Sequence, residues 1–163
     1  MGFQLIGANA SEFIVRARRA LLTLIAAVMM MVSFAPANAA SLPSKDKQEI
    51  LIRTTLMTFN DANMTGNYSV LHAKASKEVQ EQLSIEKLFE TFKPFRTNKL
   101  FFEDIIYEDY DSYEDAKLDD EGALVLAGVF KTDSMRVKFR LRFVKNDVSW
   151  KWLAITGDVR KLR

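Results

Sequence analysis

The amino-acid sequence predicts an α+β fold in which helices come first and an antiparallel sheet follows. Over residues 135–143, five apolar residues alternate with four basic ones without interruption. Strand side chains point alternately to opposite faces, so this segment is a strand with one apolar and one basic face. A second apolar run begins at Val148, and the two runs form a hairpin. Before residue 99 the apolar residues recur at helical spacing, and helices that precede all strands pack on one face of the sheet.

Residues 1–39 are predicted to be a cleavable signal peptide. Three arginines (16, 18 and 19) precede an uncharged run over residues 20–35, and Ala37-Asn38-Ala39 supplies a small-x-small cleavage site. The run is shorter than the roughly 20 residues that span a bilayer. An uncleaved membrane anchor stays open as the alternative, and Arg18-Arg19 resembles a twin-arginine export signal. We expect a periplasmic or secreted protein with no stable membrane insertion after cleavage.

Residues 40–163 are then predicted to form a single domain. The signal peptide carries three Arg and one Glu of the chain's 23 basic and 21 acidic residues, so the mature part holds 20 of each. A general role in binding nucleic acid therefore loses its electrostatic support. The chain has no cysteine, which excludes disulfides and thiolate metal sites, and it has one histidine. No metal and no cofactor is predicted.

The helices are predicted to begin after serine N-caps and to stop at a glycine or a proline. The first spans residues 45–64, and a short second helix opens at Asn67. The boundaries rest on Ser44, Gly66, Ser76, Ser84 and Pro94. Strands are predicted at 100–107, 113–118, 123–130 and from residue 135 onward, with turns at 119–122 and 131–134.

The hairpin register assigns the two faces of the sheet. With a turn at Asn146-Asp147, Phe143 faces Trp150 and Leu141 faces Trp152, which makes this face the core. The core face is predicted to include Leu124, Leu126, Phe130, Phe139, Leu141, Phe143, Trp150 and Trp152. The opposite face is predicted to carry Val125, Val129, Leu153 and Ile155 around Arg136, Lys138 and Arg140.

The order of elements resembles the nuclear-transport-factor-2-like superfamily, which includes ketosteroid-isomerase-like and polyketide-cyclase-like proteins. The resemblance covers residues 44–159 and rests on the first helix, Thr65-Gly66-Asn67-Tyr68, the short helices, and the meander that closes on Trp150-Lys151-Trp152-Leu153. It implies a cone in which a curved sheet wraps the first helix, with a pocket at the open end. Members range from enzymes to binding or assembly modules, and many dimerise through the sheet.

The aromatic residues of the hairpin either line an apolar pocket or form an ordinary core. The residues predicted to contact a small apolar ligand are Phe59, Tyr107, Phe139, Leu141 and Trp152. His72 suits acid–base catalysis by its pKa range, but it has no orienting partner at helical spacing. Isomerase-like members use an Asp base and a Tyr donor. The candidates of these types are Asp61, Asp104, Asp109, Tyr68, Tyr107 and Tyr110. No catalytic residue is assigned.

Charge is segregated along the chain. Residues 103–121 hold ten acidic residues and one lysine, whereas ten basic and three acidic residues follow Glu121. The two blocks either neutralise each other within one sheet or form a rim that binds a partner. A homodimer is predicted through Val125, Val129, Leu153 and Ile155. The sequence thus predicts an exported, non-catalytic binding or assembly module, and the alternatives are an acid–base enzyme on a small apolar substrate and a structural partner of an envelope protein.

Overall fold

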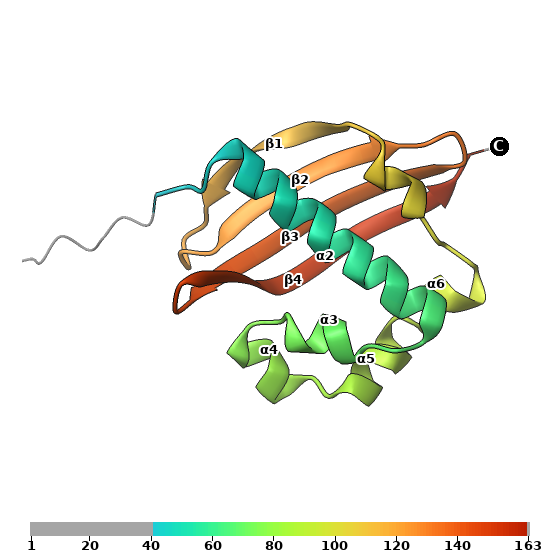
Figure 1. Cartoon of the computed structure of the whole chain (residues 1–163), viewed down its shortest axis with the longest axis horizontal. Helices are drawn as coiled ribbons and strands as arrows, with labels where there is room; N and C mark the ends of the chain where they lie inside the picture. The colour runs from blue at the N-terminus through green and yellow to red at the C-terminus, as the bar shows by residue number, and fades with distance from the viewer. Residues whose placement is uncertain (1–40, 163) are drawn as a thin grey trace, which may run out of the picture. The chain divides into compact units, whose positions relative to one another are not determined.

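A computed structural model describes residues 41–162, in which helices precede a four-stranded antiparallel sheet of order β1-β2-β3-β4 (Figure 1). The elements are α2 (Lys45–Thr65), α3 (Ser69–Ala73), α4 (Lys77–Gln82), α5 (Ile85–Thr91), α6 (Lys93–Thr97), the 3-10 helix η1 (Glu103–Ile106), β1 (Tyr110–Leu118), β2 (Leu124–Lys131), β3 (Met135–Asn146) and β4 (Ser149–Lys161). The predicted α+β class is confirmed. The predicted signal peptide lies outside the described residues. Within residues 41–162, none of the helices combines the length and apolar character needed to cross a membrane.

Helix α2 lies across one face of the sheet (Figure 1). Ser44 caps its start by accepting a hydrogen bond from the backbone N–H of Lys47 at 3.3 Å. Gly66 ends it in the left-handed conformation (φ 73°), which glycine adopts without a steric penalty. Ile52 and Phe59 are buried against the sheet. The predicted start at Lys45 and the predicted stop residue Gly66 are confirmed, and the helix ends one residue later than predicted, at Thr65.

Helices α3 to α6 form short turns beside α2 and the edge of β4 (Figure 1). Ser76 and Ser84 cap α4 and α5 through their side-chain oxygens, as predicted. Trp152 ties this layer to the sheet, because its indole N–H donates to the Leu71 carbonyl at 2.9 Å and its own carbonyl accepts from the Ser76 N–H at 2.8 Å. The edge of β4 beyond this point has no neighbouring strand among the described residues.

The predicted strand at 100–107 is wrong, since this segment contains η1 and irregular backbone. Polar side chains of α2 satisfy its backbone groups in place of a neighbouring strand. The Arg53 guanidinium donates to the carbonyls of Ile105 (2.6 Å) and Glu108 (2.9 Å), and Asn60 accepts from the Phe102 N–H at 2.8 Å. Phe102 and Ile105 are buried in the main core, so long-range contacts overrode the local preference for a strand.

The hairpin of β3 and β4 turns at Asp147-Val148, one residue later than predicted. Asn146 pairs with Ser149, and Phe143 pairs with Trp152 instead of Trp150. Asp147 adopts a positive φ of 54°, as a tight hairpin turn requires. A register error of two residues leaves every side chain on its predicted face, because the period of a strand is two.

A β-bulge in β4 changes the faces beyond Trp152. The pairing passes from Phe143–Trp152 to Arg142–Ala154, so Leu153 is the extra residue in β4. Ile155 then pairs with Leu141, whose side chain is fully buried on the face that packs on α2. The prediction that Ile155 lies on the outer face is therefore wrong. Leu153, also predicted there, is partly buried against the core.

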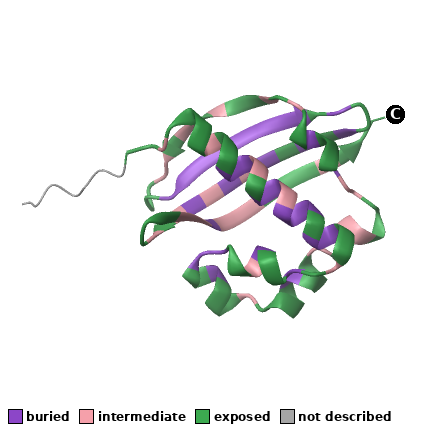
Figure 2. Ribbon diagram, in the orientation of Figure 1, coloured by how far each residue is buried: buried purple, intermediate pink, exposed green. Residues whose placement is uncertain are grey.

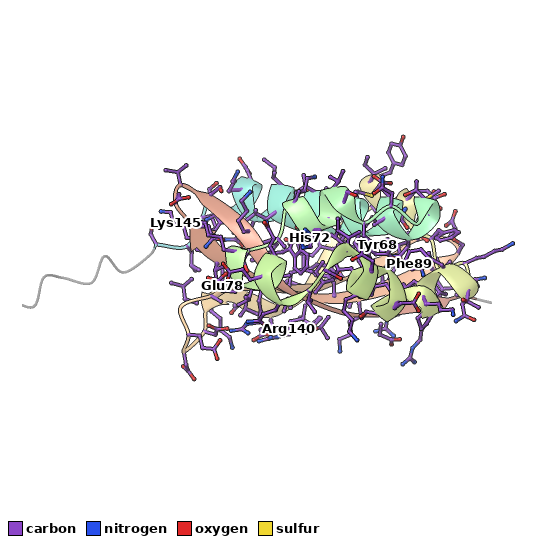
Figure 3. The ribbon with its side chains drawn as sticks, turned by 90° about the horizontal axis from the view of Figure 1, so that it is seen from below. Tyr68, His72, Glu78, Phe89, Arg140 and Lys145 are labelled. Atoms are coloured by element: carbon purple, nitrogen blue, oxygen red, sulfur yellow. The ribbon has the colours of Figure 1, made fainter. Side chains whose placement is uncertain are left out.

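The two sides of the sheet have different chemistry. Figure 2 shows that β2 is buried almost throughout, whereas the C-terminal half of β4 is exposed or intermediate. The apolar face of β2 and β3 packs on α2, as predicted. Arg140 points away from α2, on the far side of the sheet (Figure 3). We call that side the outer face and the side toward α2 the inner face.

We expect Trp152→Ala to lower the free energy of unfolding by about 3–5 kcal/mol, because a large buried aromatic side chain and the indole hydrogen bond to Leu71 are lost together. Phe139→Ala should cost a similar amount. Val148→Ala at the exposed hairpin tip is the control and should change stability by less than about 0.5 kcal/mol. Urea denaturation measures all three, and an equal effect of the tip substitution would contradict the assigned core.

Candidate functional site

Aromatic side chains gather around Phe59 near the C-terminal half of α2. The Phe59 ring meets Phe92 and Phe95 edge to face, with ring centroids 4.8 and 5.1 Å apart, and stacks at 6.3 Å on Phe102. Edge-to-face pairs are a favoured arrangement of aromatic rings. Phe92 caps the junction of α5 and α6, Phe95 lies in α6 and Phe102 precedes η1, so Phe59 of α2 contacts two distant parts of the chain.

A cavity of about 240 Å³ lies between this aromatic cluster and the inner face of β3 and β4. It is lined by Leu56, Phe59, Phe92, Phe95, Phe102, Val137, Lys138, Phe139, Ile155, Thr156, Gly157 and Val159. Lys138 and Thr156 belong to the outer face by strand alternation, so they line the cavity through their backbone. The side chains that reach the cavity are therefore aliphatic or aromatic. We call this space the apolar cavity.

Two glycines explain why the inner face is hollow here. Gly128, Phe139 and Gly157 lie in one row across β2, β3 and β4. The Phe139 ring leans over Gly128, since a Cβ at Gly128 would lie 2.8 Å from this ring. On the other side of Phe139, Gly157 has no side chain to fill the space above β4. A Cβ at Gly157 would also lie 2.8 Å from the Lys138 carbonyl oxygen, so close approach of β3 and β4 requires glycine.

The structure brings together two of the five residues predicted to contact a ligand. Phe59 and Phe139 line the apolar cavity. Leu141 is fully buried in the core, and Trp152 borders a different hollow of about 90 Å³ beside the middle of α2. Tyr107 is 90% exposed and lines neither space. The prediction missed Phe92, Phe95 and Phe102, which reach the cavity only through the path of the chain between α5 and η1.

The residue types proposed for catalysis do not meet in this cavity. His72 is half-buried, and its Nε2 lies 2.8 Å from the Leu83 carbonyl oxygen, a contact within the helical layer. Tyr68 is buried and donates to Asn63 at 2.6 Å while it accepts from Arg96 at 2.8 Å. Burial raises the pKa of Tyr68, and the hydrogen bond from Arg96 partly opposes that increase. Asp61, Asp104 and Asp109 are not among the residues that line the cavity.

The outer face differs from the prediction on which the dimer was based. Val125 and Val129 do lie on it, but Val125 is fully buried and Val129 is 8% exposed. They lie directly opposite Arg142 and Lys138 of β3, whose long side chains cover apolar neighbours while their charges stay in water. The homodimer stays a prediction. The outer face, through which it was predicted to form, exposes charged side chains instead of aliphatic ones.

Acidic residues of β1 and the following turn neutralise one end of the outer face. Glu114 pairs with Lys117 at 2.7 Å and with Arg140 at 3.3 Å. Arg142 pairs with Asp119 and Glu121 at 2.7 and 2.6 Å. The hydrogen bond from Lys117, assisted by Arg140, lowers the pKa of Glu114. The interpretation of the two charge blocks as neighbours within one sheet thus holds for this end.

Comparison with protein-family models, with curated proteins and with solved structures gives no match.

We expect Glu114→Gln to make stability less dependent on pH in the acidic range. A carboxyl whose pKa is lowered by folding contributes stability above its unfolded pKa, and that stability disappears as the pH falls below about 4.3 through the folded pKa. The variant should be slightly less stable than the wild type at pH 7, and the difference should become smaller at pH 3. Urea midpoints at both pH values test this. Asp115→Asn is the control, and an identical pattern there would contradict the assignment to Glu114.

We expect Ile155→Lys to destabilise the protein by about 1–3 kcal/mol, because it places a charge at the wall of the apolar cavity. Thr156→Lys places the same side chain one residue further on, on the exposed outer face, and should change stability by less than about 0.5 kcal/mol. Thermal or urea denaturation compares the pair. If Thr156→Lys were the more damaging change, the bulge would not set the faces of β4 as described.

Proposed function

We propose that this chain is an exported binding module that holds a small apolar ligand in the cavity between α2, α6, the segment before η1 and the inner face of β3 and β4. The observation that carries this proposal is a cavity of about 240 Å³ whose contributing side chains are all aliphatic or aromatic. The predicted signal peptide supports export, and a helix lying across an antiparallel sheet supports a cone of the nuclear-transport-factor-2-like kind.

The volume limits the size of the ligand. A space of 240 Å³ equals about eight water molecules at roughly 30 Å³ each, which is below the usual range for drug-sized ligands. The Leu, Ile, Val and Phe side chains that reach the cavity offer no hydrogen-bonding partners, so the side-chain lining favours an apolar occupant over water. A short alkyl chain or a single ring therefore fits best.

The chemistry of the lining favours binding over acid–base catalysis. A general base must reach the proton it removes, within about 2.6–3.2 Å or through one water. No carboxylate or imidazole belongs to the residues that line this cavity within the described part of the chain. The geometry thus supports a carrier or sensor of an apolar group rather than an isomerase-like or cyclase-like enzyme.

The test measures binding of 1-octanol by isothermal titration calorimetry to the wild type and to Val159→Trp. Val159 lines the cavity, so the tryptophan side chain should fill it and weaken binding by about tenfold or more. Val144→Trp is the matched control, because Val144 lies on β3 outside the cavity lining and on the other face. It should bind octanol as the wild type does. A wild type that takes up no octanol, or equal binding by Val159→Trp, would remove the cavity as a ligand site.

A further inference from the structure

The outer face of the sheet carries an excess of positive charge at the end where the apolar cavity lies. Lys131, Arg136 and Arg160 are direct neighbours in one row across β2, β3 and β4. Like charges directly opposite each other on a sheet are destabilising. Lys138 follows in the next row and adds a fourth basic side chain. We call Arg136, Lys138 and Arg160 the basic cluster.

Acidic residues neutralise this end only in part. Lys131 pairs with Asp111 at 3.1 Å, and Arg160 pairs with Asp158 at 2.6 Å. Arg136 and Lys138 make no ion pair with any residue between 41 and 162. The Lys138 ammonium lies instead 4.6 Å from the centroid of the Tyr113 ring. The opposite end differs, since Arg140 and Arg142 are both paired there.

The basic cluster surrounds a hollow of its own. A space of about 170 Å³ on the outer face is lined by Arg136, Lys138, Asp158 and Arg160. Three cationic side chains and one carboxylate converge on it, so its net charge is positive. Planar guanidinium groups suit phosphate and carboxylate oxygens because they donate two parallel hydrogen bonds. The hollow has the chemistry of an anion site.

The hollow and the apolar cavity lie on opposite faces of the same short stretch of β3 and β4. Lys138 of β3 lines both spaces. On β4, the cavity is lined by Thr156, Gly157 and Val159. The hollow is lined by Asp158 and Arg160 of the same stretch. β4 is an edge strand, and no strand covers this part of it among the described residues. Gly157 adds no side chain at the edge. A molecule that leaves the cavity over Gly157 thus reaches the basic cluster after crossing a single strand.

We propose that the ligand of the cavity is a short anionic amphiphile, whose alkyl chain occupies the apolar cavity and whose phosphate or carboxylate group binds the basic cluster over the edge of β4. This inference rests on the proposed function, because it adds a head group to the ligand that the cavity holds. Two contacts then contribute to the free energy of binding, that of the alkyl chain with the apolar cavity and that of the charged group with the basic cluster. Salt weakens the contact with the head group and leaves the contact with the chain unchanged.

The experiment compares three probes by isothermal titration calorimetry, namely octyl phosphate, 1-octanol and inorganic phosphate. Octyl phosphate should bind at least about tenfold more tightly than octanol, and high salt should reduce this preference. In the double variant Arg136→Gln with Arg160→Gln, whose residues do not line the apolar cavity, the preference should disappear while octanol binding stays unchanged. Both residues are exposed, and circular dichroism verifies that the variant is folded.

The matched control is Lys145→Gln with Lys151→Gln, which removes the same charge from the opposite end of the same two strands. Figure 3 shows Lys145 at that distant end. The control should keep the full preference for octyl phosphate. An equally large loss of preference in the control and in the Arg136 and Arg160 variant would mean that only the net charge of the protein matters, and would overturn the proposal.

The remaining outcomes of the titrations distinguish the head-group site from the apolar cavity. Equal affinity for octanol and octyl phosphate would overturn the head-group site and leave the apolar cavity as proposed. Binding of neither probe would overturn both proposals. Inorganic phosphate that binds as tightly as octyl phosphate would show an anion site that is independent of the cavity, which would overturn the link across β4.

Discussion

One extra residue in β4 determines which side chains face α2. Before the bulge at Leu153, the even-numbered residues such as Trp152 point to the inner face, and after it the odd-numbered residues do. Ile155 and Val159 therefore reach the apolar cavity, and Arg160 points to the outer face. An unbroken strand would exchange these positions and place the charged side chains against α2. Both candidate binding surfaces depend on this change of phase.

Much of the fold follows from rules that act over a few residues. The helix limits at Ser44 and Gly66 follow from capping, and the faces of β2 and β3 follow from strict alternation. The predicted strand pairings next to the turns differ from the observed ones by two residues. Such a shift leaves each side chain on its predicted face, because strand side chains alternate with a period of two. The bulge was missed, although the sequence contains its signal. Apolar residues change from even to odd positions between Trp152 and Ile155.

The cavity was less predictable because its walls are distant in sequence. Local pattern placed a strand at 100–107, but Arg53 and Asn60 of α2 hold this segment as irregular backbone and thereby bury Phe102 beside Phe59. Such contacts join side-chain donors and acceptors to backbone groups more than 40 positions away. They cannot be predicted from the periodicity of apolar residues along the sequence. Phe95 likewise reaches the cavity after the break between α5 and α6 at Phe92, where helical spacing no longer indicates a face.

The bond between Trp152 and the layer of short helices has a consequence for the order in which the chain folds. Ser76 and Leu71 find their partner only when the last strand is present, about 80 residues later. Helix α2 likewise has no sheet to pack on until β2, β3 and β4 have been synthesised. Contacts of such long range slow folding, because a large loop must close before they form. The core formed by residues 41–162 therefore cannot be completed before β4 has been synthesised.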